Sequence, residues 1–313
     1  MQHETALNRI AAFCLVARDS AALVRFYKAL GFVQEASAPR PIAADEAALL
    51  GLAGGGMRYA MGLGAARLWI DQYDRPGRPY PDGTDAASRC FQHFALATDD
   101  IAAAWERVQA AGATPVSRAG PVTLPASTGG VIAVKFRDPE GHPLELIQFP
   151  DGESRGWQGR GILGIDHSAV AVANAEQSRA FYRAHGLVEG SATLNHGPAQ
   201  AALDGLDDVR VDVVPMHPAG PGPHVELLHY RHPQGAPVEP WAIHDVAATR
   251  IVWQGPPPPP PPRCCAIRTG ISTRSTALRK PAHSPPRWGR RARNAAAFSP
   301  RAGRSRAAAW MPR

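Results

Sequence analysis

Internal repetition is the feature that most constrains the fold of this 313-residue chain. The stretch FYKALGFVQ, which begins at Phe26, returns as FYRAHGLVE at Phe181. A second stretch, AALLGL at Ala47, returns as AALDGL at Ala201. The two offsets are 155 and 154 residues. A nearly constant offset indicates that the chain contains two homologous halves.

A shorter unit repeats within each half. Three apolar stretches typical of strands are each followed by an N-cap residue, an amphipathic helix and a glycine suited to ending the helix. The predicted strands are 9–17, 91–98 and 165–173, and the predicted helices are 21–30, 101–111 and 175–185. Three extended segments follow each helix, so the order βαβββ occurs three times. A fourth copy begins at 249–254 and stops at a run of prolines.

These repeats predict an α+β fold of repeated βαβββ modules in two tandem domains. Residues 1–150 are expected to form the first domain from two modules, and 151–162 a linker. Residues 163–254 would hold the third module and the first strand of the fourth, so the second domain is predicted to be truncated. Residues 255–313 form a tail outside the fold.

The basic character of the chain is confined to this tail. Of the 34 Lys and Arg, 13 follow residue 254, together with none of the 27 Asp and Glu, which leaves 21 basic and 27 acidic residues before it. This slightly acidic body offers no electrostatic basis for binding nucleic acid. Residues 256–262 are seven prolines, which exclude helix and strand, and the charge of one sign beyond them is typical of disorder. The tail is either a basic arm or out-of-frame sequence, and the proline run favours the second interpretation.

The cellular setting follows from what the sequence lacks. The N-terminus has no basic segment followed by an apolar run, and no apolar stretch is long enough to cross a bilayer. The four cysteines have no metal-site spacing and are too few for a disulfide scaffold. We therefore expect a cytoplasmic protein without a membrane partner.

A hairpin sequence adds a second signature. In DPEGHPLEL, which starts at Asp138, Pro139 and Gly141 suit turn positions, and the alternation that follows turns Glu145 toward one face. Together with the FY-x-x-x-G motif and the βαβββ repeat, this sequence resembles the vicinal oxygen chelate superfamily. That superfamily includes glyoxalase I, extradiol dioxygenases, fosfomycin-resistance proteins and bleomycin-binding proteins. The resemblance covers roughly residues 9–254 and implies half-barrel cups, each built from two modules.

The resemblance also implies a divalent metal site in each cup, with a His on the first strand and a Glu on the fourth strand of a module. The ligands implied in modules two and three are His93, Glu145, His167 and Glu226. The corresponding residues of modules one and four are Ala12, Trp69 and Arg250, which cannot replace these ligands. Histidines outside this set, such as His142, are expected at the surface.

Two ways of pairing the modules remain open. If consecutive modules pair, each cup holds two ligands, which is a weak site for a divalent ion. If module two pairs with three and module one with four, all four ligands meet in one site suited to Zn, Ni, Fe or Mn, and the other cup is metal-free. A homodimer that exchanges modules would assemble the same four residues.

A four-ligand site implies a glyoxalase-like metalloenzyme that acts on a small vicinal-oxygen substrate. Its isomerase or lyase chemistry would pass through a metal-bound enediolate, with Glu145 or Glu226 as the base. One alternative is an extradiol-type ring-cleaving dioxygenase, although the fourth-module His and Glu that it needs are missing. Another is a metal-free small-molecule-binding or resistance protein, and a third is a truncated product with little activity.

Overall fold

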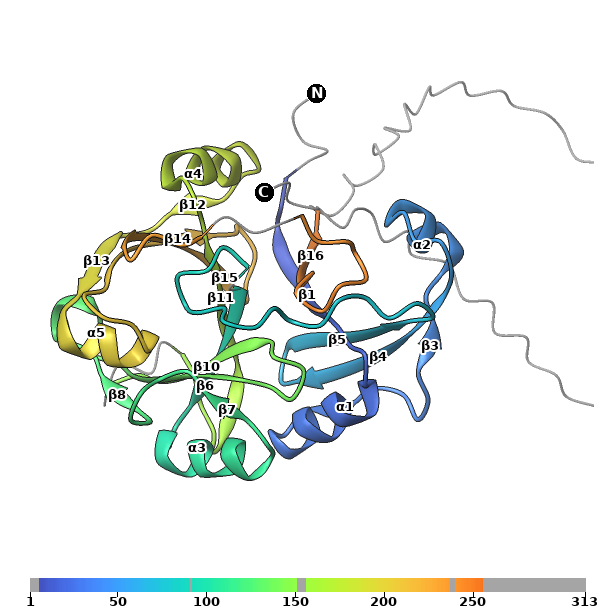
Figure 1. The fold of residues 1–313 in the computed structure, drawn as a ribbon, viewed down its shortest axis with the longest axis horizontal. Helices are drawn as coiled ribbons and strands as arrows, with labels where there is room; N and C mark the ends of the chain where they lie inside the picture. Colours follow the sequence, from blue (N-terminus) through green and yellow to red (C-terminus); the bar gives the residue numbers. More distant parts are fainter. Residues whose placement is uncertain (1–5, 91, 151–155, 237–239, 256–313) are drawn as a thin grey trace, which may run out of the picture. The chain divides into compact units, whose positions relative to one another are not determined.

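The computed structural model describes residues 6–90, 92–150, 156–236 and 240–255, which form an α+β structure (Figure 1). All of these residues belong to one compact unit. The predicted tail lies outside the described residues except for Gly255, as do residues 151–155 of the predicted linker. The domain boundaries and the truncation of the second domain therefore stay predictions.

The described elements follow the predicted βαβββ order. The first module comprises β1 (Arg9–Val16), α1 (Ser20–Ala29), β2 (Val33–Gln34), β3 (Arg40–Pro41), α2 (Ala44–Leu49), β4 (Gly56–Leu63) and β5 (Ala66–Tyr73). The second comprises β6 (Gln92–Thr98), α3 (Ile101–Ala110), β7 (Thr114–Pro115), β8 (Val122–Thr123), the 3-10 helix η1 (Ala126–Thr128), β9 (Ile132–Arg137) and β10 (Pro143–Gln148). The third comprises β11 (Ile162–Ala171), α4 (Ala175–Ala184), β12 (Val188–Glu189), β13 (Thr193–His196), α5 (Gly197–Asp204), β14 (Arg210–His217) and β15 (His224–His232). In the described part of the chain, the fourth module contributes β16 (Arg250–Gln254).

Helices α1, α3 and α4 begin and end at the residue types that the sequence predicts. Their N-cap side chains each accept a hydrogen bond from the backbone N–H three residues on, and these caps are Asp19, Asp100 and Asn174. Each cap satisfies an N–H that the first helical turn leaves without a partner. The glycines after the helices have φ angles of 98°, 97° and 89°, and they are Gly31, Gly112 and Gly186. This left-handed backbone is open to glycine, which explains where the helices stop.

The strands form two sheets that pair module two with three and module one with four. The ten-stranded sheet has the order β12-β14-β15-β11-β6-β10-β9-β7, with β13 on β14 and β8 on β9. The six-stranded sheet has the order β16-β1-β5-β4-β2, with β3 on β4. In the larger sheet β6 and β11 are antiparallel neighbours, so the second and third modules meet at its middle. The strand order therefore confirms the predicted pairing of module two with three and of module one with four.

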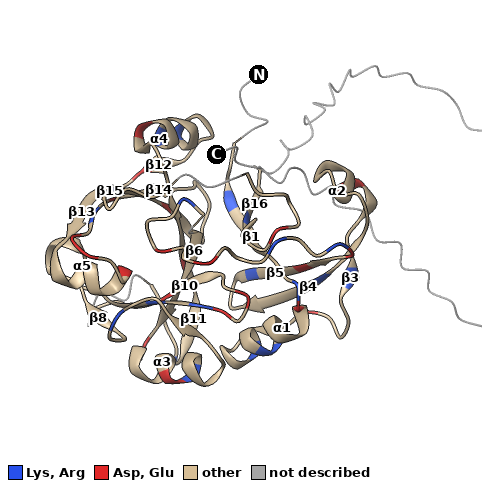
Figure 2. Cartoon of the chain, viewed as in Figure 1, with Lys and Arg blue, Asp and Glu red and all other residues tan. Residues whose placement is uncertain are grey.

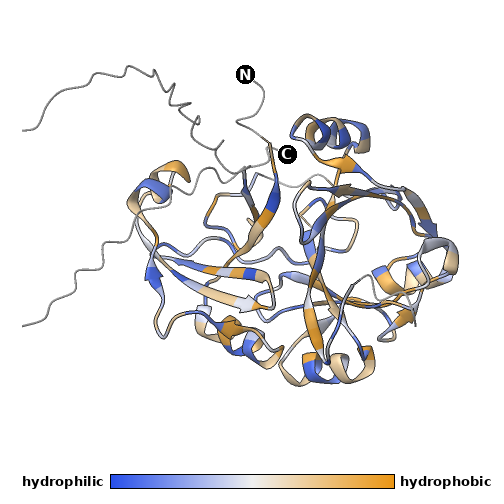
Figure 3. Ribbon diagram, turned by 180° about the vertical axis from the view of Figure 1, so that it is seen from behind, coloured by the Kyte–Doolittle hydropathy of each residue, from blue (hydrophilic) through white to orange (hydrophobic). Residues whose placement is uncertain are grey.

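Alternation along the strands separates an apolar core from a second, more polar face. On β6, Phe94 and Leu96 belong to the main core, whereas His93 lines a cavity on the other face. On β10, Leu146 is in the same core and Glu145 lines the same cavity. Figure 3 shows hydrophobic colour concentrated on the central strands, and Figure 2 shows acidic and basic segments interspersed over the described chain. This period of two is what directs selected polar side chains to one place.

The sequence did not predict helices α2 and α5. They span six and eight residues and end within the repeated AALLGL and AALDGL segments. Such short helices depend on tertiary packing rather than on intrinsic propensity, and each buries an apolar side chain, Ala47 and Leu203 respectively. Within the described residues, no helix has the length and apolar character needed to span a membrane.

Candidate active site

One cavity brings together the four residues predicted as metal ligands. It has a volume of about 380 Å³ and is lined by residues from β6, β9, β10, β11, β14 and β15 of the larger sheet. His93, Glu145, His167 and Glu226 all line it. Of these four residues, the second and third modules each contribute one His and one Glu.

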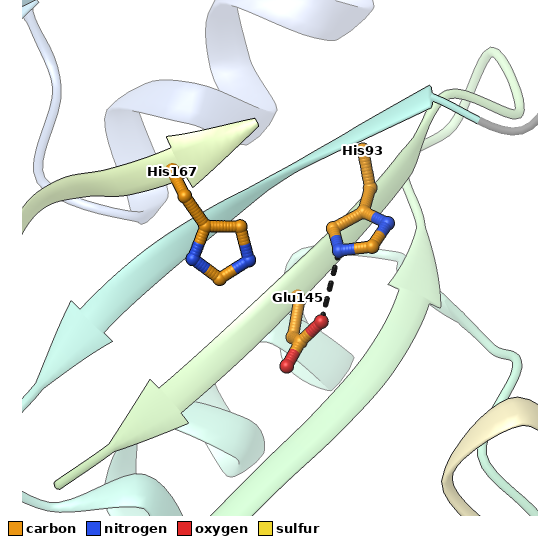
Figure 4. Close-up of side chains that lie close together, drawn as sticks. All are labelled: His93, Glu145 and His167. Atoms are coloured by element: carbon orange, nitrogen blue, oxygen red, sulfur yellow. Dashed lines mark ion pairs between the residues drawn. The ribbon is translucent and has the colours of Figure 1, made fainter. Parts of the chain in front are cut away.

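The side chains of His93, Glu145 and His167 point toward one another (Figure 4). One possible ligand atom from each lies within 4.8 Å of those of the other two. His93 Nε2 is 2.9 Å from Glu145 Oε2, and the two imidazole rings are 5.9 Å apart. Glu226 also lies near this group, with its Oε2 3.6 Å from His167 Nε2. The arrangement gathers two imidazoles and two carboxylates.

Strand register explains this convergence. Ala95 on β6 pairs with Glu145 on β10 and with His167 on β11. Ala169 on β11 pairs in the same way with Glu226 on β15 and with His93 on β6. Both alanines are fully buried. Because alanine has the smallest side chain that a strand can carry there, the larger polar groups on both sides can meet above it.

Asp166 is a site residue that sequence reasoning missed. Its Oδ2 lies 3.0 Å from His167 Nδ1, while its Oδ1 accepts a hydrogen bond of 3.1 Å from Trp157 Nε1. The β6–β11 register shifts between Ile165 and His167, so the two neighbours Asp166 and His167 both line the cavity. A carboxylate on the far nitrogen of an imidazole fixes the orientation of the ring and makes it a stronger ligand. Asp166 therefore holds His167 with Nε2 toward Glu226.

Two further histidines stand beside Glu226. His224 Nε2 is 3.4 Å from Glu226 Oε1, and the ring of His217 stacks on that of His224 at 4.7 Å. His224 also belongs to a second group, with Asp166 and His167, that has the spacing of metal ligands. Histidines outside the ligand set are expected at the surface; His217 is exposed at the end of β14, whereas His224 is partly buried at the start of β15. The third-module half of the site therefore has more polar support than the second-module half.

The charges of the site are strongly coupled. Burial by itself would raise the pKa of Glu145, but the hydrogen bond with His93 and the charge of Lys135 lower it. Burial lowers the pKa of His93. Burial would do the same to His167, but Glu226 and Asp166 raise its pKa to about 9. In the metal-free protein the site thus holds ionised carboxylates and one protonated imidazole near neutral pH.

Lys135 is a second residue that the sequence analysis did not single out. It pairs with Glu145 across β9 and β10, and it lines the cavity. Its Nζ lies 2.6 Å from Asp204 Oδ1, and Asp204 Oδ2 accepts further hydrogen bonds from Gln200 and Tyr230. Burial would lower the pKa of Lys135, but Asp204 and Glu145 outweigh that effect and raise it. A permanently charged ammonium therefore stands next to the predicted ligands.

The smaller sheet carries a different polar cluster at the equivalent positions. Cys14 on β1 has the same place in its sheet as Ala95 on β6. It pairs with Trp69, at the position of Glu145, and with Arg250, at the position of His167. Arg250 donates to Cys14 Sγ, Asp71 Oδ2 and Tyr73 OH at 2.8, 2.8 and 2.9 Å. In this sheet a buried cation and its hydrogen-bond acceptors take the place of the imidazole and carboxylate ligands.

The expectation that His142 lies at the surface is wrong. The residue is 1% exposed, and its Nδ1 is 2.9 Å from Asp138 Oδ2. Asp138 also accepts a hydrogen bond from the hydroxyl of buried Tyr27, 111 residues away in the chain. A strand-end position says little about burial when a helix of another module covers it.

Comparison with family models finds one that matches the N-terminal part of the chain. Residues 7–146 match the family model described as Glyoxalase/Bleomycin resistance protein/Dioxygenase superfamily. This part of the chain is therefore similar to members of that superfamily. No curated protein matches the chain.

Several solved structures are also similar to the chain. A glyoxalase I variant from Zea mays is 16% identical, with 72% of this chain and 69% of that chain covered and a TM-score of 0.49. A 4-hydroxymandelate synthase variant from Streptomyces coelicolor is 16% identical, with 75% of this chain and 66% of that chain covered and a TM-score of 0.34. A methylmalonyl-CoA epimerase from Mycobacterium tuberculosis is 19% identical, with 46% of this chain and 87% of that chain covered and a TM-score of 0.32.

Proposed function

We propose that the cavity of the larger sheet is the active site of a glyoxalase-like metalloenzyme. Its substrate would be a small molecule with two neighbouring oxygens, and its reaction an isomerisation or elimination at the adjacent carbon. The observation that carries this proposal is the meeting of His93, Glu145, His167 and Glu226 in one cavity. These residues come from two modules, each of which supplies one His and one Glu at equivalent strand positions.

The donor set fits a divalent metal ion. Imidazole nitrogens and carboxylate oxygens are ligands suited to Zn²⁺, Ni²⁺, Fe²⁺ and Mn²⁺. Asp166 supplies the carboxylate support that metal-bound histidines usually have. When bound, the metal would supply Lewis acidity to the two substrate oxygens.

We assign proton transfer to Glu226 rather than to Glu145. Glu145 is held by His93 at 2.9 Å, and its side chain is 8% exposed. Glu226 is 3.6 Å from His167, and its side chain is 20% exposed, so it is less tightly held and more open to the cavity. A base must reach the carbon-bound proton of the substrate, and the less constrained carboxylate meets that condition better.

A second candidate function has support from the ligand count. The three most closely grouped residues, His93, Glu145 and His167, are two histidines and one carboxylate. This is the donor set of iron-dependent oxygenases, which leave the remaining metal positions open. A ring-cleaving dioxygenase is therefore the alternative. Glu226 separates the two functions, because it is the base in the first and is not needed for activity in the second.

The test combines metal analysis with two assays. Protein stripped of metal is reloaded with Zn²⁺, Ni²⁺, Mn²⁺ or Fe²⁺ under argon. It is then assayed for isomerisation of the hemithioacetal of methylglyoxal and glutathione, and for oxygen uptake with catechol. We expect isomerase activity that depends on the added metal, and its loss in Glu226→Gln with metal retained. Oxygen uptake with Fe²⁺ alone would support the dioxygenase instead.

Substitution of the histidines tests the site itself. His93→Ala and His167→Ala should each lower bound metal strongly while the circular dichroism spectrum stays the same. His229→Ala is the matched control, because His229 contacts Asp212 away from the four ligands and should keep its metal. Unchanged metal content in both site variants would refute the assignment.

A further inference from the structure

Lys135 breaks the symmetry between the two halves of the cavity. Its cross-strand partner is Glu145. The residue paired with Glu226 in the third module is Pro215, and the residue paired with Trp69 in the first is Ala60. A lysine at this register therefore occurs only in the second module among the three described modules. The repeat does not require it, so the fold alone does not explain it.

The ammonium of Lys135 has hydrogen-bonding capacity left over. A lysine ammonium carries three N–H donors. Among the described residues, its side chain makes one hydrogen bond, to Asp204 Oδ1 at 2.6 Å. The side chain is 4% exposed and lines the cavity. Two donors of a buried cation are therefore available to a molecule that fills this space.

Asp204 is arranged to keep that cation in place. It lies at the C-terminal end of α5, is 1% exposed, and accepts from Gln200 at 2.8 Å and Tyr230 at 3.1 Å as well as from Lys135. Gln200 in turn accepts from Asn195 at 3.1 Å. All of these partners except Asp204 itself are cavity-lining residues. A surface ion pair would not need such a chain of buried supports, whereas a binding group does.

We propose that Lys135 is the anion-binding group of the substrate subsite and that the substrate carries a carboxylate beside its two chelating oxygens. This inference rests on the proposed metal-dependent function. Two N–H donors of one ammonium match the oxygens of a carboxylate, and such charge-assisted hydrogen bonds are strongest away from water. Glu145 and Glu226 would repel a free anion, so the subsite acts when a divalent cation balances their charge. Because Lys135 pairs with Glu145 on the neighbouring strand, a substrate carboxylate bound to Lys135 would lie close to the metal-bound part of the substrate.

The test compares two probes that differ in one charged group. Malate and 2-hydroxybutyrate both offer a hydroxyl and a carboxylate as neighbouring oxygens, but only malate has a second carboxylate. Their dissociation constants are measured by calorimetry on protein loaded with Mn²⁺ or Zn²⁺. We expect wild-type protein to prefer malate by about tenfold or more, as one charged hydrogen-bond pair would give. The preference should fall to within about threefold in Lys135→Met and be kept in Lys135→Arg.

Two further measurements make the outcome decisive. Lys135→Met leaves Asp204 buried without its cation, so the double variant K135M/D204N removes both charges and guards against misfolding. Metal content is measured in every variant. If K135M/D204N folds, keeps its metal and still prefers malate, or if wild-type protein with metal binds both probes equally, Lys135 is only a structural ion pair and the inference is overturned. If wild-type protein takes up no metal, the proposed function fails and this inference fails with it.

Discussion

The affinity of the site for metal should depend steeply on pH because of His167. Glu226 and Asp166 raise the pKa of this imidazole to about 9, against an ordinary value of 6.5. A protonated imidazole cannot ligate, so the metal must displace a proton. The pKa of His93 is lowered by burial, and the pKa values of Glu145 and Glu226 are lowered mainly by their histidine neighbours, which outweigh burial. Above neutral pH, His167 is therefore the ligand whose proton competes with the metal.

The magnitude follows from the fraction of deprotonated imidazole. With a pKa of about 9, lowering the pH from 8 to 6 reduces the apparent affinity about 90-fold. With an unperturbed pKa of 6.5 the same change would reduce it only about fourfold. Because the pKa of His167 is raised, the metal affinity increases with pH until about pH 9. Over the same range, the metal-free protein loses the stabilisation that protonated His167 gains from its carboxylate neighbours.

Competition with a chromophoric chelator at pH 6, 7 and 8 measures this dependence. The variant Asp166→Asn provides the comparison, because it removes one of the carboxylates that raise the pKa of His167. We expect a smaller pH slope and a metal affinity about 10- to 100-fold weaker at pH 8, since Asp166 also orients the ring. A wild-type slope no steeper than about fourfold between pH 8 and 6 would refute the electrostatic argument.

Two other changes test the rest of the account. Arg250→Met removes a buried cation from Asp71, Cys14 and Tyr73 and should lower the free energy of unfolding by about 3–5 kcal/mol in urea denaturation, with little change for the exposed Arg231→Met. Phe94→Ala removes a fully buried ring that stacks on Phe13 at 5.5 Å and should cost about 3–5 kcal/mol by the same measurement. A loss under 1 kcal/mol in either variant would contradict the packing described here.

The repeat made the order of the main elements predictable. Strand, cap, helix and glycine recur with local residue types, and the structure reproduces them at Asp19, Asp100 and Asn174 within a residue or two of the predicted boundaries. The ligand positions were predictable for the same reason, because alignment of three copies places His93 and His167 at one register. The resemblance to a known superfamily then offered a pairing of modules, which local sequence patterns do not specify.

What escaped prediction depends on contacts between strands and modules. Asp166 reaches the cavity only because the β6–β11 register shifts beside it, and no local residue pattern marks that shift. Lys135 meets Asp204 across 69 residues, and its place beside Glu145 follows from the β9–β10 register. The burial of His142 comes from packing near Tyr27 of another module, which no local residue pattern indicates. Long-range register or packing between modules, rather than propensity, decided each of these cases.

X-ray absorption spectroscopy of the metal-loaded protein tests the central claim most directly. The account predicts a Zn²⁺ or Ni²⁺ ion bound by two imidazoles and by carboxylate oxygens at about 2.0–2.2 Å. One imidazole contribution should be lost in His93→Ala and in His167→Ala. A spectrum without histidine scattering, or one unchanged by both substitutions, would contradict a metal centre shared by the second and third modules.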